Sequence, residues 1–462
     1  MGYRLREFEA ESKFSRELTL EAISQAVPTD AIQAVIQAES AHEARERKLN
    51  MVVVVLIIIA MNLYARLAIV AVMQKIAQGL RFIWPDPDYR VPHDSAFTYR
   101  RYQLGARPLM VLFGRVCRPL ATLQTPGAFL FGLRLMAIDG TTEDVPDTPE
   151  NVAVFGRHPS QRGDSAFPQV HGVYLCECGT HAIVEASFWP CHISERRGGF
   201  RVLRGVRPDM LVMWDRGFHD FDMIQGVRQR QGQVLARLPS HVQPKRVRTL
   251  PDGSYWAYLY PSDYQRRKRG EHLLVRIIEY TLTDPALPGY GEIHRLVTTL
   301  LDDHAYPALD LACAYHQRWD IEMVIDELDT HQRLAGRPLR SHKPVGVIQE
   351  LYGLLIAHYA LRALMHDAAC QAGIAPDQIS FVHALEVVHD AIVEFQMVAP
   401  DQRPRLYARL LRDLAAGCLP PRRLRTNPRV VKRKMSKFPL KRPEHAHGLQ
   451  PTRLFRDTVE LI

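Results

Sequence analysis

A chain of 462 residues is longer than a single hydrophobic core usually supports, so we expect two or three domains. Its composition, 47% hydrophobic and 24% charged residues, excludes a mainly disordered chain. The formal net charge of +9 favours a polyanionic partner. Seven cysteines, an odd number scattered along the chain, argue against a disulfide framework and for a reducing compartment, with the cytoplasm as the expected location.

The N-terminal region predicts helices up to about residue 90. Segments 15–27 and 29–47 have helical character, and an apolar run follows from Met51 to Met61. This run is too short for a membrane span, and Asn62 and Arg66 interrupt its continuation. A buried helix is therefore favoured over a membrane anchor, and we expect no membrane partner.

Strands are predicted after the proline-rich stretch 85–95. The apolar run in FGLRLMAIDGTT ends at Asp139 and Gly140, and MLVMWDRGF repeats this design with Asp215 and Gly217. Between these runs, VHGVYLCECGTHAIVEASFW predicts two strands about a turn at Gly179. A long strand-rich interval follows, with QVLARLPS, GSYWAYLYPS, LLVRIIEYTL and HRLVTTLLD.

Cysteine and histidine residues near that turn raise the alternative of a zinc site. Structural zinc sites usually separate paired cysteines by two to four residues, whereas CECGTH has only one residue between its cysteines. The hairpin interpretation is favoured over zinc. The residues concerned are Cys176, Cys178, His181, Cys191 and His192.

The segment AYHQRWDIEMVIDELDTHQR, Ala314 to Arg333, predicts an amphipathic helix. At about 100° per residue, an apolar stripe covers one side and a group of polar side chains lies at its margin. These polar residues are either a solvated flank with i,i+4 pairs or part of a cleft. The stripe is Ile321, Val324, Ile325 and Leu328, and the polar group is Tyr315, Arg318, Glu322 and Asp329. Two more helices are expected, at 346–369 and 380–398.

Three carboxylates are candidates for metal chemistry: Asp139, Asp215 and Glu322. Functional groups of open α/β sheets gather at the carboxyl ends of strands, where the two aspartates are predicted. Three acids brought together repel one another unless cations neutralise them, and Mg²⁺ or Mn²⁺ prefers such oxygen ligands. Two such ions can stabilise the attacking and leaving oxygens of a phosphoryl displacement. An aspartate after a strand also has a simpler explanation, the formation of an Asx turn.

Basic residues are concentrated near the C-terminus. Without the ten cations of segment 421–443, the formal charge of +9 would become −1. Contact with a phosphate backbone is favoured over solvated disorder for this segment. The ten residues are Arg422, Arg423, Arg425, Arg429, Lys432, Arg433, Lys434, Lys437, Lys441 and Arg442.

These motifs together resemble the insertion-sequence-four type of DDE transposases. Tyr315, two spacers, Arg318, three spacers and Glu322 match the signature of that group, as do DGTT at Asp139 and DRGF at Asp215. The resemblance implies an α/β fold with a ribonuclease-H-like core and a β-rich insertion. It divides the chain into a helical N-terminal DNA-binding domain (1–95), the first part of the core (96–245), the β-rich insertion (246–303), the catalytic helix with the following helices (304–400) and a basic C-terminal tail (401–462).

The resemblance also implies a reaction and its partners. Asp139, Asp215 and Glu322 would bind two Mg²⁺ or Mn²⁺ ions, while Tyr315 and Arg318 would contact the DNA end. The protein would bind element ends as double-stranded DNA, cleave there, and join the freed 3′ hydroxyl to target DNA, acting at least as a homodimer when bound. It would be cytoplasmic and associated with the nucleoid. A non-catalytic DNA-binding repressor or decayed copy is the alternative.

Two further residues bear on DNA binding. Trp256 shares a strand face with other aromatic residues and is either a platform for an unstacked base or a sheet-packing residue. Asp329 stands where the family signature has a lysine, six spacers after Glu322. An anion at this position is expected to repel DNA phosphate, unless it turns outward or pairs with Arg333.

Overall fold

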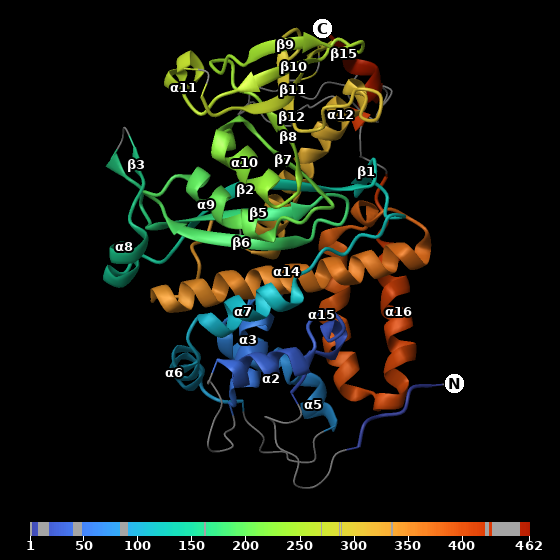
Figure 1. Cartoon of the computed structure of the whole chain (residues 1–462). Coiled ribbons are helices and arrows are strands. Elements are labelled where there is room, and N and C mark those ends of the chain that lie inside the picture. Colours follow the sequence, from blue (N-terminus) through green and yellow to red (C-terminus); the bar gives the residue numbers. More distant parts are fainter. Residues whose placement is uncertain are drawn as a thin grey trace, which may run out of the picture. The chain divides into compact units, whose positions relative to one another are not determined.

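The computed structural model describes the chain with several gaps, and it divides into two compact units (Figure 1). The described residues are 2–7, 18–39, 49–83, 91–160, 163–268, 270–285, 287, 289–333, 336–420, 425–426 and 453–462. Unit 1 comprises Met1–Ala128, Gly140–Val202 and Ile321–Pro420. Unit 2 comprises Phe129–Asp139, Leu203–Asp320 and Pro421–Ile462.

Unit 1 is built around the long helix α14, Pro344–Ala372, and most residues of this helix are buried. The apolar helix α3, Met51–Leu63, packs against it and is itself almost wholly buried, which confirms the predicted buried helix. Asn62, the polar residue of α3, donates from Nδ2 to the carbonyls of Ile58 (2.9 Å) and Glu350 (3.3 Å). Within the described residues, no helix has the length and apolarity needed to cross a membrane.

Most of the other helices of unit 1 lie around this pair, whereas α9, Glu195–Val202, packs on strands β5, Gln169–Glu177, and β6, Ile183–Pro190 (Figure 1). Asn50 caps α3 by accepting from Val53 N at 2.9 Å, and Ser380 caps α15 by accepting from His383 N at 3.3 Å. Parts of the predicted N-terminal helices, 8–17 and 40–48, lie outside the described residues. The remaining helices are α2 Thr29–Ala38, α4 Ile69–Ile76, α5 Gln78–Ile83, α6 Asp94–Leu104, α7 Arg107–Val116, α8 Pro149–Phe155, α9 Glu195–Val202, α15 Phe381–Met397 and α16 Arg403–Ala416.

Unit 1 also contains the predicted hairpin. Strands β5, Gln169–Glu177, and β6, Ile183–Pro190, pair antiparallel about Gly179, whose φ of +84° suits glycine. In hydrogen-bonding order β5 is followed by β2, Leu133–Asp144, whose last five residues belong to this unit. A Cβ at Gly140 would lie 3.0 Å from the carbonyl oxygen of Gly172, so the glycine after Asp139 allows these strands to approach.

Unit 2 is mainly a mixed sheet in the order β2-β7-β8-β12-β11-β10-β9. The first three strands are parallel and the others antiparallel, so the predicted strands of the core and of the strand-rich interval are present. Helix α10, Phe221–Gln229, joins two parallel strands. The strands are β7 Met210–Trp214, β8 Gln233–Arg237, β9 Lys245–Thr249, β10 Tyr255–Leu259, β11 Leu273–Leu282 and β12 His294–Thr298, and a short helix α11 spans Asp263–Lys268.

The predicted helix Ala314–Arg333 is interrupted. It consists of α12, Ala308–His316, a 3₁₀ turn, α13, Asp320–Asp326, and a π-helical turn, Glu327–Gln332. The apolar stripe prediction is confirmed for Ile321, Val324 and Leu328, which are fully buried, whereas Ile325 is only half-buried. The uniform 100° spacing was wrong, since the 3₁₀ turn tightens the helix and the π turn loosens it.

The C-terminal residues fold back onto unit 2. Strand β15, Val459–Leu461, pairs antiparallel with β11. The ring of Phe455 stacks on His316 of α12 at 3.8 Å between centroids, and burial lowers the pKa of His316 to about 4. The chain end is therefore part of the folded unit that contains Tyr315.

Candidate active site

Asp139 and Asp215 lie side by side in unit 2. Strands β2 and β7 are parallel, and Ile138 is the register partner of Trp214. The next residue of each segment is the candidate aspartate, so the two lie at adjacent positions where β7 ends. Asp215 follows the last residue of β7 as predicted, whereas the prediction of a strand end at Asp139 was wrong, because β2 continues to Asp144. Both aspartates are half-buried. The apolar strands therefore place two acids together, as ligands for one cation would require.

Arg318 binds the first of these acids. Its NH1 donates to Asp139 Oδ2 at 3.1 Å, and the two side chains are 9% and 22% exposed. The guanidinium carbon also lies 5.5 Å from the ring centre of Trp319 and 6.0 Å from that of Tyr315. A charge-assisted contact in such partial burial stabilises the Asp139 carboxylate and fixes the orientation of Arg318.

Tyr315 is buried next to the second acid. Its hydroxyl donates to the carbonyl oxygen of Trp214 at 3.3 Å, the residue before Asp215. Burial raises the pKa of the Tyr315 phenol well above its usual range, with the nearby Arg318 acting in the opposite direction. Tyr315 is therefore a neutral hydrogen-bond donor that ties α12 to the end of β7.

Asp215 has the Asx-turn geometry that was its simpler explanation. Its Oδ1 accepts from Gly217 N at 2.8 Å and caps the short 3₁₀ turn Arg216–Phe218. A carboxylate has two oxygens, and this bond uses one lone pair of one of them. The capping role and a metal-binding role are compatible.

Glu322 lies on α13 in unit 1 and is half-buried. The neighbouring Ile321 and Val324 are completely buried and fix one side of that helix. The structure thus brings Asp139, Asp215, Arg318 and Tyr315 together in unit 2, with Glu322 on the helix that continues into unit 1.

Asp329 also has defined contacts in unit 1. Its Oδ2 accepts from Thr141 Oγ1 of β2 at 3.1 Å, and its Oδ1 lies 3.9 Å from Arg333 NH1. Burial raises the pKa of Asp329 to about 6, partly offset by the Thr141 bond, and the Asp326 charge raises it further. Arg333 is bound more closely by Glu143. The i+4 contact with Arg333 is present, and Asp329 also binds β2.

The aspartate pair fits a hard divalent cation. Sites for Mg²⁺ commonly use one or two carboxylates and complete their coordination with water and substrate phosphate oxygens. Among the described residues, no three His, Cys, Asp or Glu side chains form a ready metal site. The donor set that the geometry supports directly is therefore Asp139 with Asp215.

Trp256 lies on β10 in unit 2 and is half-buried. Its indole Nε1 donates to the carbonyl oxygen of Leu301 at 2.9 Å, and the Arg248 guanidinium lies 5.6 Å from its ring centre. Tyr258, on the same face, contacts the ring of His272 at 4.4 Å between centroids. The indole is anchored by its nitrogen and keeps a partly accessible face.

Most of the predicted basic DNA contacts lie outside the described residues. Arg425 is described only in its backbone, in the two-residue strand β13, which pairs with Arg453–Leu454. The others that were predicted to bind DNA are Arg422, Arg423, Arg429, Lys432, Arg433, Lys434 and Lys437.

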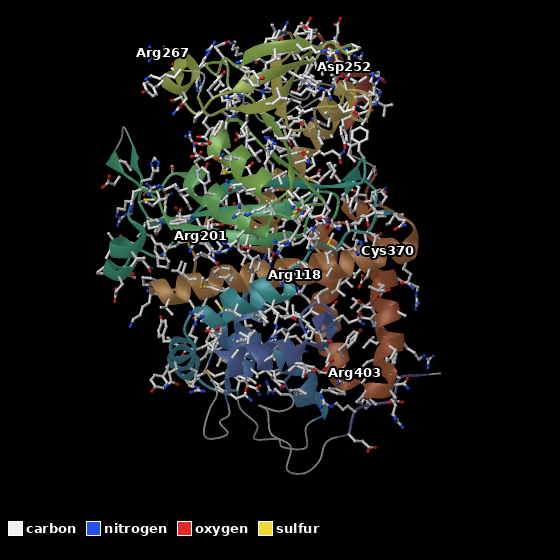
Figure 2. The ribbon with its side chains drawn as sticks, viewed as in Figure 1. Arg118, Arg201, Asp252, Arg267, Cys370 and Arg403 are labelled. Atoms are coloured by element: carbon white, nitrogen blue, oxygen red, sulfur yellow. The ribbon has the colours of Figure 1, made fainter. Side chains whose placement is uncertain are left out.

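A second basic surface was missed in the sequence. All five residues of β9 are exposed, and three of them are cations. Helix α11 adds three exposed cations in a row, of which Figure 2 labels Arg267. The segments KRVRT and QRRK show these cations in the sequence. They were overlooked because the ten cations of segment 421–443 account for the whole net charge. We name this set the β9–α11 basic surface: Lys245, Arg246, Arg248, Arg266, Arg267 and Lys268.

Two family models and a curated relative match this chain. Residues 17–114 match the family described as the insertion element 4 transposase N-terminal domain, and residues 130–360 match the transposase DDE domain. The chain is 29% identical over 355 residues to the transposase InsG for insertion sequence element IS4 of Escherichia coli K12, covering 75% of this chain and 78% of that protein.

A solved structure is also similar over most of its length. It is the piggyBac transposase synaptic complex with hairpin DNA, with a TM-score of 0.42 and 16% identity, covering 88% of this chain and 84% of that one. The expected α/β fold with a helical N-terminal region is confirmed by the elements described above and by the DDE domain match. The chain belongs to the IS4-type DDE transposases.

Proposed function

We propose that this transposase performs metal-dependent cut-and-paste transposition with Asp139, Asp215 and Glu322 as its catalytic acids. The observation that carries the proposal is the register of Ile138 with Trp214, which puts Asp139, inside β2, next to Asp215, which follows the last residue of β7. The signature spacing from Tyr315 through Arg318 to Glu322 supports the third acid.

Two Mg²⁺ or Mn²⁺ ions, when bound, supply activation of the attacking oxygen and neutralisation of the leaving oxygen. The carboxylates of Asp139, Asp215 and Glu322 would hold them. Arg318, which binds Asp139 without substrate, carries a planar donor group suited to a phosphate of the DNA end. Tyr315 keeps the helix carrying Arg318 attached to β7 through its bond to Trp214.

The proposed substrate is double-stranded DNA carrying the terminal inverted repeats of an element. Cleavage at each end frees a 3′ hydroxyl, which then attacks a phosphodiester of target DNA. Action on two ends implies at least a homodimer in the DNA complex. The N-terminal helices, the β9–α11 basic surface and segment 421–443 supply the candidate DNA contacts, and Trp256 is the candidate base platform.

The variant Asp215→Asn tests the catalytic assignment. Asparagine keeps the side-chain oxygen that accepts from Gly217 N, so the turn survives while the negative charge is removed. We expect Mg²⁺-dependent cleavage of a labelled element end to disappear and binding of that end to remain. A matched control is Asp220→Asn, which removes the charge of another aspartate that caps a helix through a backbone bond, at 2.9 Å to Asp222 N. Cleavage by Asp215→Asn at the wild-type rate would reject the assignment.

A DNA-binding repressor that does not cleave is the second candidate function. Asp329 in place of the family lysine is the observation that raises it, because the cation of that lysine is missing for DNA phosphate, although Asp329 itself contacts Thr141 and Arg333. End binding by the wild-type protein without cleavage in either Mg²⁺ or Mn²⁺ would select this function.

The contribution of the C-terminal cations to DNA binding is measured with substitutions, because a truncation would also disturb the fold. Removal of everything after Pro420 would delete β15, which pairs with β11, and would unfold part of unit 2 for reasons unrelated to DNA. Replacement of the cations of 421–443 by glutamine leaves β15 intact. The slope of log affinity against log salt concentration should then decrease by about one for each phosphate that these cations neutralise in the wild-type complex.

A further inference from the structure

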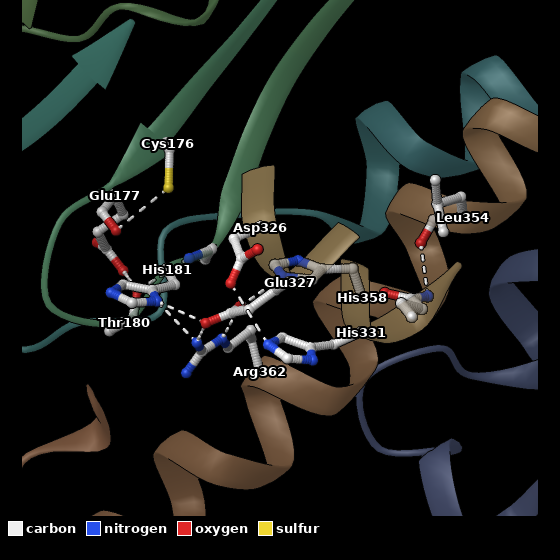
Figure 3. Close-up of polar contacts among 12 residues, drawn as sticks. Cys176, Glu177, Thr180, His181, Asp326, Glu327, His331, Leu354, His358 and Arg362 are labelled. Atoms are coloured by element: carbon white, nitrogen blue, oxygen red, sulfur yellow. Dashed lines mark hydrogen bonds and ion pairs between the residues drawn. The ribbon is translucent and has the colours of Figure 1, made fainter. Parts of the chain in front are cut away.

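A buried polar cluster lies immediately beyond the helix that carries Glu322 (Figure 3). The Glu327 carboxylate accepts from Arg362 Nε at 2.9 Å and also from Arg362 NH2. His358 Nε2 lies 2.9 Å from Glu327 Oε2, and His181 Nδ1 lies 3.1 Å from Oε1. All four side chains are at most 7% exposed. We name this set the Glu327 cluster.

The protonation of the cluster follows from its contacts. Burial lowers the pKa of His358 to about 3, so its imidazole is neutral and donates from Nε2 to Glu327. Arg362 NH2 lies 2.7 Å from His181 Nδ1 and donates to it, which leaves His181 neutral. One negative and one positive charge remain, in a bidentate geometry. Losing either partner would leave the other charged and buried, which is strongly destabilising.

The cluster joins three elements of unit 1. Glu327 begins the π-helical turn, His358 and Arg362 lie on successive turns of α14, and His181 lies in the β5–β6 turn. His181 has a φ of +62°, a conformation that side-chain-bearing residues adopt rarely. The phenyl ring of Phe381 covers the group, 5.4 Å from His358 and 5.5 Å from the Arg362 guanidinium. The carboxylate of Glu327 therefore has one permitted position, set by three directions of contact.

The Glu327 bonds act together with the bond of Thr141 to Asp329 in the π turn and with apolar packing along the helix. Ile321, Val324 and Leu328 are buried apolar residues, and apolar packing tolerates small rotations better than a bidentate bond does. At the other end of the π turn, Gln332 donates from Nε2 to the carbonyl oxygen of Leu354 at 3.2 Å. A rotation of the helix moves the Glu322 carboxylate, which lies on the turns just before Glu327.

We propose that Glu327 is a positioning residue for the reaction: its bonds to Arg362 and His358, with Arg362 held in turn by His181, fix the rotation of α13 and so orient the Glu322 carboxylate as a metal ligand. The inference rests on the proposed function, in which Glu322 is a metal ligand. It deepens that function by assigning the orientation of one ligand to a buried cluster that touches neither metal nor DNA.

The first test uses Glu327→Gln, which keeps the size and shape of the side chain but removes its charge. The matched control is Asp326→Asn, which neutralises the neighbouring exposed carboxylate, 3.4 Å from His331 Nε2. Amide hydrogen exchange is measured on both metal-free proteins. We expect exchange of residues 320–332 to rise at least tenfold in Glu327→Gln while α3 and α7 remain protected, and to stay unchanged in the control.

Metal affinity gives the second measurement. Binding of Mn²⁺ to the full-length protein with an uncleavable end duplex is followed by electron paramagnetic resonance. We expect Glu327→Gln to weaken Mn²⁺ binding about tenfold or more and to raise the Mg²⁺ concentration needed for half-maximal cleavage by a similar factor. The KM for the DNA end should change less than twofold, because no DNA contact is altered.

Glu327→Gln leaves the buried Arg362 charge without its counter-ion, which destabilises the fold. A second, milder variant keeps the inference testable if Glu327→Gln unfolds. Arg362→Lys keeps the charge but removes the bidentate bond, so it should fold and show a smaller defect of the same kind. Wild-type exchange and wild-type metal affinity in both variants would overturn the inference. The proposed function fails separately if Glu322→Gln cleaves normally, whereas the inference fails if Glu322→Gln is inactive and Glu327→Gln is indistinguishable from wild type.

Discussion

Arg318 donates to the Asp139 carboxylate at 3.1 Å, so one member of the family signature neutralises the first of the three proposed catalytic acids. A cation binding to Asp139 must compete with this guanidinium or share the carboxylate with it. When a DNA phosphate is available, Arg318 has a second anion to bind. The Arg318–Asp139 pair would therefore couple metal binding at Asp139 to phosphate binding by Arg318.

The variant Arg318→Gln tests this link. In the absence of DNA we expect it to bind Mn²⁺ several-fold more tightly than the wild type, because Asp139 is freed from its competing cation. Cleavage should nevertheless fall at least tenfold, because glutamine cannot replace the guanidinium at the phosphate. Electron paramagnetic resonance and end cleavage measure the two effects. The control is Arg134→Gln, which breaks an arginine–aspartate pair with Asp209 near the other end of β2. Equal metal affinity of Arg318→Gln and wild type would show that the pair does not compete.

Asp329 predicts a pH dependence of stability. Its pKa is raised from 3.8 to about 6, so between these values the folded state retains a proton that the unfolded state releases. The folded protein consequently loses stability as the pH rises from about 4 to 6. Asp329→Asn should therefore be more stable than wild type above pH 6, by about 2 kcal/mol after allowing for partial exposure. The difference should vanish below pH 4. Chemical unfolding at several pH values measures it, with Glu386→Gln, an exposed residue of α15, as the control.

Several parts of the site were predictable because they depend on local sequence. Apolar runs that end in an aspartate define β2 and β7, and parallel pairing of those runs is enough to align Asp139 with Asp215. The buried stripe of α13 was predictable for the same reason, since three apolar residues at helical spacing specify one face.

Other parts depend on partners far along the chain. Glu327 looks like one more acid on a polar helix, and its role appears only when His181 and Arg362, from distant segments, meet it. The π turn was missed because periodicity assumes a uniform helix. The exposed strand β9 lacks apolar alternation, so KRVRT carried no strand signal.

His358 predicts a loss of stability in acid. Its pKa is lowered from 6.5 to about 3, so the unfolded state gains a proton first as the pH falls. The stabilisation is complete above pH 6.5 and declines below it, by about 2 kcal/mol at pH 5. His358→Gln, whose amide can still donate to Glu327, should be less sensitive to acid over this range. Unfolding midpoints between pH 7 and 5 measure the effect. His241→Gln removes an exposed imidazole and should leave the wild-type acid sensitivity unchanged.

The β9–α11 basic surface predicts a second electrostatic contact with DNA, independent of the C-terminal cations. Lys245, Arg246 and Arg248 lie on an exposed strand, with Arg246 3.7 Å from the ring centre of Tyr255, so the aromatic side chain helps to hold its guanidinium in place. An edge strand rich in cations is also a common protection against aggregation, which would leave DNA binding unaffected.

Replacing these three cations by glutamine separates the two explanations. If they contact phosphates, the slope of log affinity against log salt concentration should decrease by about three, and the affinity for unrelated duplex DNA should fall together with that for the element end. The control replaces Arg405 and Arg412, exposed cations of α16, and should leave the slope unchanged. Fluorescence anisotropy with a labelled duplex across a salt series measures both proteins. An unaltered slope together with increased aggregation of the triple variant would assign these cations to protection of the strand edge.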